Sequence, residues 1–220
     1  TYRLALACTG EYAAAVGGGT IAGALAAQVT TMNRVNGVFE RDVAVTMTII
    51  ANNNLIIYTN AGTDPYTDNN AGALIGEVQT DIDTKIGSGN YDIGHVFSTG
   101  GGGLAGLGVV CINGQKGRGV TGSANPQGDA YDIDYVAHEM GHQFSGNHTQ
   151  NNNCNRNGGT AMEPGSGSSI MAYAGICAPN VQNNSDALFH GVSLGEIGAF
   201  ITGTGDGCPV KSALTNTAPS

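Results

Sequence analysis

Charged side chains are scarce in this 220-residue chain, since Asp, Glu, Lys and Arg together make up only 11% of it, under half of the usual share of about 25%. Only eight residues are Lys or Arg, they are scattered, and the formal net charge is −9. A nucleic-acid partner would require clustered cations, so the composition argues against one. Solubility must instead depend on the negative charge and on the many Asn, Thr and Ser residues.

Long apolar runs are also missing, and no segment is long and apolar enough to cross a membrane. A charged and then apolar secretory leader is absent, so we expect a mature form from which a leader and a pro-segment have been removed. The run Gly100–Gly103 is not followed by Gly-Lys-Ser/Thr and is therefore no phosphate loop. It is either a flexible approach to the next strand or an ordinary permissive loop.

Hydrophobic periodicity predicts alternating strands and helices in one domain of two unequal lobes, which we expect to be a monomer. The apolar or beta-branched segments predict strands, and the segments with apolar residues at helical spacing predict helices. The predicted strands span 2–8, 43–50, 91–98 and 104–111, and the predicted helices span 20–40, 72–86, 131–144 and 192–201. Residues 151–167 are rich in turn formers.

Three of the five histidines, His138, His142 and His148, lie within eleven residues. On a helix, His138 and His142 stand one turn apart on the same face and can bind one metal ion. Gly146 and Asn147 tolerate a positive φ, so the chain can turn back and present His148 as a third ligand. Three protein ligands and one open position are typical of catalytic zinc, whereas structural zinc usually has four.

Glu139 follows the first histidine and would lie beside the ion. A carboxylate in that place is better suited to take a proton from water than to act as a ligand. The alternative is a surface helix whose histidines are solvated or satisfied in the core. A third histidine six residues beyond the second makes this alternative much weaker.

The pattern resembles the long motif His-Glu-x-x-His-x-x-Gly-x-x-His of the metzincin zinc endopeptidases. Ser145 occupies the family's glycine position and Gly146 follows it, so we expect either a turn displaced by one residue or backbone strain at Ser145. The segment 168–173 resembles the metzincin methionine turn, in which Met171 would pack beneath the metal without binding it. Tyr173 matches, by its spacing, a tyrosine that approaches zinc or the oxyanion in astacins and serralysins; the alternative is an ordinary core tyrosine.

The cysteines resemble those of the reprolysin, or adamalysin-like, branch, and the similarity to bacterial secreted reprolysin-like metallopeptidases covers most of the chain. The residues alone leave all three pairings of four cysteines open. The resemblance implies the disulfides Cys111–Cys208 and Cys154–Cys177, and Cys8, in an apolar run, is expected to be a buried thiol. Thr149 departs from the venom and animal enzymes, which carry aspartate after the third histidine.

The resemblance implies an α/β (α+β) catalytic domain. Its parts would be a twisted mixed sheet with an antiparallel edge strand, two long helices, the zinc helix, and a small irregular C-terminal subdomain ending in a helix. We expect an N-terminal lobe over 1–148, a C-terminal lobe over 149–210, and a linker over 211–220 to a further C-terminal domain.

The implied activity is that of a secreted, zymogen-derived endopeptidase that uses one zinc ion and Glu139 as general base to hydrolyse internal peptide bonds of a protein or peptide. The edge strand would pair with the substrate. The expected substrate contacts are Leu104, Ala105, Gly106, Leu107, Gly108, Ala172 and Ala174. The oxygen-rich segment Asp64–Asn70 is a candidate for Ca²⁺, although its residues also suit a plain turn.

Two other functions compete with this one. A secreted binding or adhesion module could keep the zinc without turnover, although Glu139 argues against it, since inactive relatives often lose that residue. An enzyme of the same fold could also hydrolyse an amide other than a protein.

Overall fold

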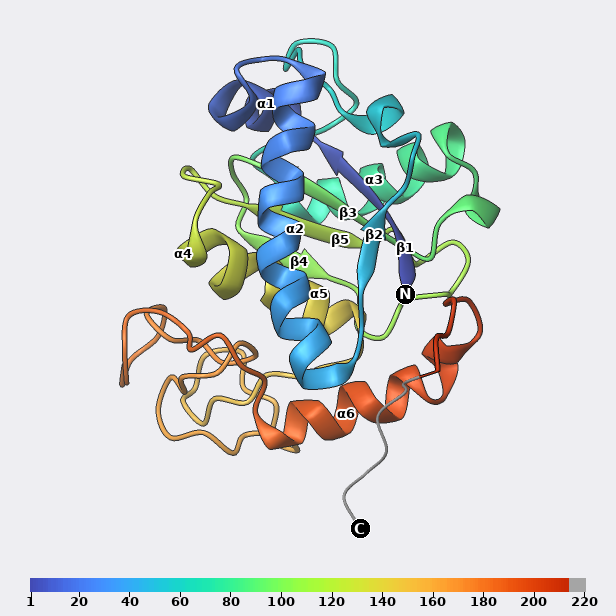
Figure 1. Ribbon diagram of the computed structural model, residues 1–220. Coiled ribbons are helices and arrows are strands. Elements are labelled where there is room, and N and C mark those ends of the chain that lie inside the picture. Colours follow the sequence, from blue (N-terminus) through green and yellow to red (C-terminus); the bar gives the residue numbers. More distant parts are fainter. Residues whose placement is uncertain (214–220) are drawn as a thin grey trace.

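Five strands form one mixed sheet in the order β2-β1-β3-β5-β4, as the computed structural model, which describes residues 1–213, shows (Figure 1). The strands β1, β2, β3 and β5 are parallel, and only β4 runs antiparallel, at the edge. Their bounds are Tyr2–Cys8 (β1), Met47–Ile49 (β2), Ile93–Ser98 (β3), Gly103–Ala105 (β4) and Gly119–Gly122 (β5). The predicted mixed sheet with an antiparallel edge strand is confirmed.

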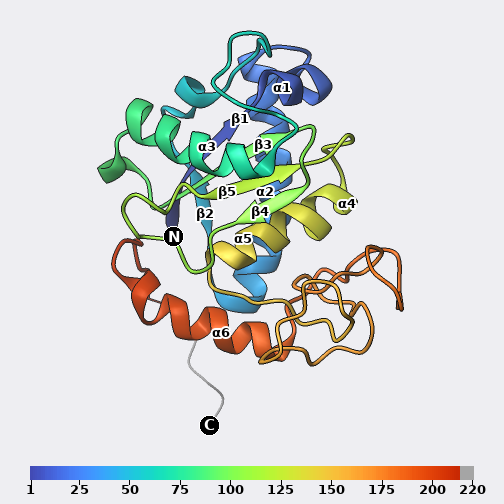
Figure 2. The same ribbon diagram turned by 180° about the vertical axis from the view of Figure 1, so that it is seen from behind.

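Helices cover both faces of this sheet. Helix α2 crosses one face in Figure 1, and α3 covers the opposite face in Figure 2. The helices are α1 (Gly10–Gly17), α2 (Ile21–Val43), α3 (Ala71–Lys85), α4 (Asp129–Tyr131), the π-helical turn η3 (Asp132–Ala137), α5 (His138–Gln143) and α6 (Gly191–Ile201), with short 3-10 turns at Asn53–Ile56 (η1), Ser88–Asn90 (η2) and Thr204–Asp206 (η4). Helix α1 is an addition to the predicted set.

Strand β1 divides the core into two, because successive side chains of a strand point to opposite faces. Leu4 and Leu6 are fully buried on the side of α2, where Phe39 packs. Ala5 and Ala7 face the other side, where the buried side chains come from α3 and its surroundings. The helix that carries the histidines lies on the same side as α2, so the large aromatic core supports it directly.

The strand predicted over 43–50 begins too early, because β2 starts only at Met47. Val43 is the last residue of α2, and Ala44 takes a left-handed φ of 55° while its N–H donates to the carbonyl of Phe39. Such a cap satisfies the free carbonyls of a helix end and turns the chain. Only Met47–Ile49 then pairs with β1.

The strand predicted over 104–111 is also too long, since β4 ends at Ala105. The next residues leave the sheet to cap α5, as Gly108 and Val109 donate their N–H groups to the carbonyls of His142 and Gln143. Gly108 has a left-handed φ of 62°, which breaks the extended backbone. The strand next to β4, β5, was not predicted at all.

Residues between α5 and α6 form an irregular segment beside α5 in both views (Figures 1 and 2). A parallel bridge between Gln150 and Glu163 and the disulfide Cys154–Cys177 hold it. A second disulfide, Cys111–Cys208, ties the residues after α6 to the segment that follows β4. The cysteines are therefore paired as the resemblance implied, and Cys8 is a buried free thiol.

Within residues 1–213 no single helix has both the length and the apolar character to cross a membrane. Helices α1 and α2 have that length and apolar character only when taken together, and the pair is bent by 80°. The division into lobes at residue 148 stays a prediction. Of the predicted linker 211–220, residues 214–220 lie outside the described part of the chain.

Candidate active site

The first two histidines stand on a continuous helical stretch, 129–143, made of α4, the π-helical turn η3 and α5. Two aspartates of η3 anchor it. Asp132 accepts a 2.8 Å hydrogen bond from the Thr31 hydroxyl of α2, and Asp134 accepts one of 2.8 Å from the N–H of Ser185 in the irregular segment. π-helical turns often occur at functional sites, where they shift the face that the next residues present.

The chain reverses at Ser145, which has a left-handed φ of 76°, whereas Gly146 does not. The N–H of Ser145 donates to the carbonyl of His142, and the N–H of Gly146 donates to that of Gly141. Of the two arrangements that the sequence left open, the turn is therefore in the family's place, and Ser145 carries the strained backbone. The reversal returns His148 to the face of α5.

The three imidazoles converge on one point. The Nε2 atom of His142 lies 3.1 Å from that of His138 and 3.0 Å from that of His148, and the remaining pair is 3.3 Å apart. Each Nδ1 atom instead faces a backbone carbonyl, that of Ile170, Gly146 or Asn155 respectively for His138, His142 and His148, at 2.7 to 2.9 Å.

These carbonyls fix the tautomer, because a carbonyl oxygen can only accept and so each Nδ1 carries the hydrogen. Burial and the neighbouring imidazoles keep the pKa of His138 well below its ordinary value, and burial followed by the proximity of His148 lowers the pKa of His142 to about 4. Burial also lowers the pKa of His148. Three neutral rings thus point three lone pairs at one another.

This donor set fits a zinc ion. A tetrahedral ion with Zn–N bonds of about 2.0 to 2.1 Å separates its nitrogen ligands by roughly 3.3 Å, close to the separations of the Nε2 atoms. Lone pairs in this arrangement cannot hydrogen-bond to one another, whereas a cation would satisfy all three. Carbonyls on Nδ1 are also the usual outer partners of metal-bound histidines.

Glu139 lies beside this cluster and is 7% exposed. Its carboxylate rests against the backbone of Gly103 in β4, so closely that a Cβ there would overlap it. Among residues 1–213 no side chain or N–H donates to the carboxylate, and burial raises the pKa of Glu139 to about 8. The group is therefore held in place by packing and is free to interact with a molecule in the cleft.

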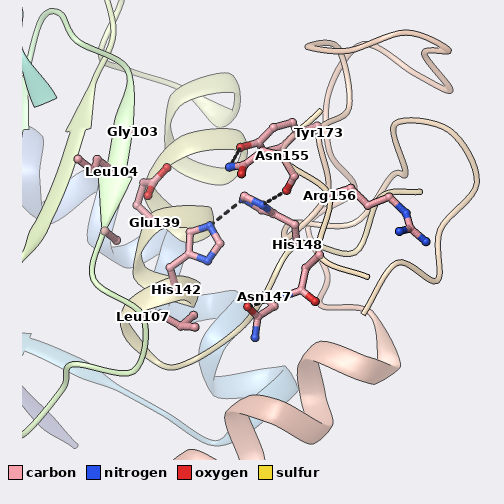
Figure 3. A pocket seen from close by; sticks show the side chains of 12 residues that line it. Gly103, Leu104, Leu107, Glu139, His142, Asn147, His148, Asn155, Arg156 and Tyr173 are labelled. Carbon is pink, nitrogen blue, oxygen red and sulfur yellow. Dashed lines mark hydrogen bonds between the residues drawn. The ribbon is translucent and has the colours of Figure 1, made fainter. Parts of the chain in front are cut away.

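A cavity of about 340 Å³ opens over these groups (Figure 3). One wall is apolar and comes from β4 and the residues after it, and the other is polar and comes from the irregular segment. The lining residues are Gly103, Leu104, Ala105, Leu107, Glu139, His142, Asn147, His148, Asn155, Arg156, Asn157 and Tyr173.

Only some of the residues predicted to contact the substrate lie at this cavity. Leu104, Ala105 and Leu107 line the cavity, whereas Gly106, Gly108, Ala172 and Ala174 do not. Ala172 and Ala174 are 3% and 4% exposed, because the methionine turn directs them inward on either side of Tyr173.

Met171 is fully buried, and its sulfur lies where a Cβ of Gly141 would stand. The glycine inside the histidine motif therefore lets the methionine turn approach α5. Tyr173 packs edge to face against the third histidine, with ring centroids 4.6 Å apart, and its hydroxyl accepts a 3.1 Å hydrogen bond from the side-chain amide of Asn155.

Glu163 connects the third histidine to the methionine turn. Its buried carboxylate accepts hydrogen bonds from the hydroxyls of Thr149 and Ser169 and, at 2.9 and 3.0 Å, from the N–H groups of Ser168 and Ser169. Burial acts to raise the pKa of Glu163, but these four donors outweigh it and lower the pKa. Thr149, directly after the third histidine, is thus joined to the methionine turn through the carboxylate of Glu163.

The oxygen-rich segment forms hydrogen bonds within the protein. Asp64 accepts from the N–H groups of Gly10 and Tyr66, and Asp68 accepts from Thr9 and from both the N–H and hydroxyl of Thr99. In the described part of the chain, the three histidines are the only group of metal-binding side chains that converge.

Residues 1–198 match the profile of metallo-peptidase family M12B, reprolysin-like. The chain belongs to this family. It is therefore a reprolysin-like metzincin and a zinc metalloendopeptidase by class, with a sheet and a histidine cluster that agree with a metzincin catalytic domain. None of the curated proteins matches it. Its placement among bacterial enzymes stays a prediction.

Several residues at this site were not anticipated from the sequence, namely Gly103, Asn155, Arg156, Asn157 and Glu163. Gly103 and Asn155 lie in segments rich in glycine or asparagine, where nothing in the pattern marks one residue above its neighbours. Glu163 did carry a signal, since it is the only acidic residue between Glu139 and Asp186.

Proposed function

We propose that this reprolysin-like enzyme is a secreted endopeptidase that cleaves internal peptide bonds of proteins, with zinc on His138, His142 and His148 and with Glu139 as general base. The convergence of three Nε2 lone pairs within 3.3 Å of one another carries the proposal. The two disulfides support an oxidising, extracellular location.

When bound, zinc supplies Lewis acidity toward the substrate carbonyl and acidifies water at its open position. Glu139 takes the proton from the attacking water and passes it to the nitrogen of the scissile bond, which leaves as an amine. Tyr173 donates a hydrogen bond to the oxygen of the tetrahedral intermediate, where negative charge develops. Met171 supports the histidines from below without touching the substrate.

The substrate backbone pairs with β4, which has β5 on one side only. An extended peptide could add to the other side and place its scissile bond over Glu139. Leu104, Ala105 and Leu107 then contact alternate substrate side chains. We also propose the two lobes 1–148 and 149–210, a pro-segment and a further C-terminal domain. Calcium is not part of the proposal, because the carboxylates of Asp64 and Asp68 already accept hydrogen bonds from the protein.

The test is cleavage of a quenched casein substrate by the purified chain, with and without 1,10-phenanthroline, together with metal analysis by mass spectrometry. We expect one zinc per chain and cleavage that the chelator abolishes. Glu139→Ala should keep the zinc and lower kcat by about 10² to 10⁴, the usual contribution of a general base. Substantial residual turnover in that variant would refute the role of Glu139, and zinc without any cleavage would favour a binding module.

A further inference from the structure

Asn155 touches both the third histidine and Tyr173. Its backbone carbonyl accepts the Nδ1 hydrogen of His148 at 2.9 Å, and its side-chain amide nitrogen lies 3.1 Å from the Tyr173 hydroxyl (Figure 3). The residue has a left-handed φ of 49°, which asparagine tolerates better than most residues. One residue thus connects a metal ligand to the tyrosine beside it.

The direction of the second hydrogen bond matters. An amide NH₂ group can only donate, so the oxygen of Tyr173 is the acceptor and its own hydrogen remains free. Among residues 1–213 that hydroxyl makes no other hydrogen bond. Since Tyr173 lines the same cavity as Glu139 and His148, its hydrogen is available to an acceptor that enters the cleft.

The two segments are also held together covalently. Cys154, directly before Asn155, forms a disulfide with Cys177, four residues after Tyr173. The carbonyl of Cys154 accepts a 2.8 Å hydrogen bond from the side chain of Gln150. The exposed side chain of Asn155 is therefore carried on a restrained backbone, which lowers the entropic cost of holding it against the tyrosine.

We propose that Asn155 is a positioning residue that makes the Tyr173 hydroxyl a hydrogen-bond donor toward the developing oxyanion of the substrate. The inference rests on the proposed function. Asn155 does not touch the substrate itself; it occupies the acceptor side of the phenol so that the phenol hydrogen points into the cleft. The backbone carbonyl of the same residue fixes the tautomer of His148 independently of the side chain.

Three variants separate these effects. Asn155→Gly keeps the left-handed backbone and the carbonyl bound to His148 but removes the amide. Asn155→Asp has nearly the same shape but only accepts, so it captures the phenol hydrogen. Tyr173→Phe removes the hydroxyl. The matched controls are Asn153→Gly and Asn153→Asp, because Asn153 is an exposed asparagine two residues earlier whose side chain makes no hydrogen bond among residues 1–213.

We expect Asn155→Gly to lower kcat by about 10- to 100-fold, somewhat less than the loss of a full oxyanion donor, with KM and zinc affinity within about twofold. Asn155→Asp should lower kcat at least as much as Tyr173→Phe, and the controls should match the parent chain. In the Tyr173→Phe background, Asn155→Gly should have no further effect, because it acts through the lost hydroxyl.

A loss that persists in the Tyr173→Phe background, or a parallel fall in zinc affinity measured by chelator competition, would overturn the inference. A second readout is the ¹⁵N resonance of the Asn155 side-chain amide in the zinc-loaded protein, which Tyr173→Phe should shift and Asn153→Gly should not. If the parent chain binds zinc but cleaves nothing, the proposed function fails, and an unshifted amide would then separately refute the contact.

Discussion

At the scale of single residues, the site depends as much on glycines and on one strained serine as on the three converging histidines. Gly103 leaves the space that Glu139 occupies, and Gly141 leaves the space for the sulfur of Met171. Ser145, by contrast, keeps a side chain at a position whose φ of 76° favours glycine. At Gly103 and Gly141 a neighbouring side chain leaves no room for a Cβ, whereas at Ser145 the backbone conformation disfavours one. Adding a Cβ at Gly103 should therefore do harm, and removing the side chain of Ser145 should stabilise the protein.

Gly103→Ala should impair catalysis without unfolding the chain. The added Cβ overlaps the end of the Glu139 side chain, which is flexible enough to move aside. A displacement of about 1 Å can cost roughly 10²-fold in rate, so we expect kcat to fall at least tenfold while zinc content and the melting temperature stay unchanged. Gly89→Ala is the control, since a Cβ there meets nothing within 4 Å. Full activity in Gly103→Ala would contradict the position assigned to Glu139.

Ser145→Gly should stabilise the protein. A left-handed residue with a Cβ costs about 1 to 2 kcal/mol, and part of the gain is offset by the greater entropy of glycine in the unfolded chain. We expect a net gain of about 0.5 to 1 kcal/mol in urea unfolding. Ser145→Ala keeps the Cβ and should show no gain, which separates the backbone effect from the hydroxyl. Equal stability of the glycine and alanine variants would show that Ser145 is not strained.

At the scale of elements, the long periodic segments could be predicted from the sequence and the short glycine-rich ones could not. The strand predicted over 2–8 and the helices over 20–40 and 72–86 agree with β1, α2 and α3 within a few residues, because many buried apolar side chains specify them. Strand β5 has the sequence Gly-Val-Thr-Gly, and glycine disfavours strands.

The reason for those glycines is visible only in three dimensions. A Cβ on Gly119 would overlap His95 and the side chain of Gln143, and one on Gly122 would overlap the carbonyl of Gly100. Of the proposed metal ligands, His138 and His142 could be predicted because their spacing reflects one turn of one helix, and His148 could be predicted from the resemblance to the metzincin motif. Asn155 could not be predicted, and Glu163 could be noticed only as an isolated acid without a role, because their partners lie on segments whose relative placement depends on the irregular fold after residue 148.

Glu163 joins two irregular segments of the site. Its carboxylate accepts hydrogen bonds from Thr149, directly after His148, and from Ser169 in the methionine turn. Glu163→Ala leaves the buried N–H of Ser169 and the partly buried N–H of Ser168 without an acceptor and should lower the free energy of unfolding by about 3 to 5 kcal/mol. Zinc affinity should fall by about 10- to 100-fold, as for other outer-sphere changes, because the carbonyl of Ile170 that orients His138 lies on the same turn.

Two variants make the measurement specific. Glu163→Gln keeps an acceptor for the N–H groups and an amide that can donate to the two hydroxyls, so it should cost only about 1 kcal/mol. Asp186→Ala removes an exposed carboxylate from the same irregular segment and should cost nothing. Urea unfolding and chelator competition report the two quantities. If Glu163→Ala were as stable as Glu163→Gln, the carboxylate would not be what holds the turn.

At the scale of the whole molecule, the sheet and the helix that carries the histidines meet at a buried polar contact. His95 of β3 is fully buried and lies 2.8 Å from the side-chain oxygen of Gln143 and 2.8 Å from the hydroxyl of Thr121. The amide nitrogen of Gln143 donates to the carbonyl of Gly94, which fixes its oxygen as the acceptor for His95. A neutral imidazole therefore satisfies every partner at this contact.

This contact predicts the pH dependence of stability. Burial lowers the pKa of His95 to about 4, against about 6.5 in the unfolded chain, so the unfolded state binds the proton more readily. The contribution of His95 is fully present above pH 6.5 and is lost as the pH falls toward 4. Over that window the loss should reach about 3 kcal/mol.

His95→Gln removes this titration. Urea unfolding of the metal-free parent and variant from pH 8 to pH 4 isolates it, because the three clustered histidines titrate in both proteins and cancel in the difference. The variant should be less stable than the parent at pH 8, because its amide cannot reproduce both hydrogen bonds. The gap should then close by about 3 kcal/mol as the pH falls to 4. If the free energies of unfolding of the two proteins changed in parallel with pH, His95 would be protonated as easily in the folded as in the unfolded chain. The contact between β3 and α5 would then tolerate a buried charge.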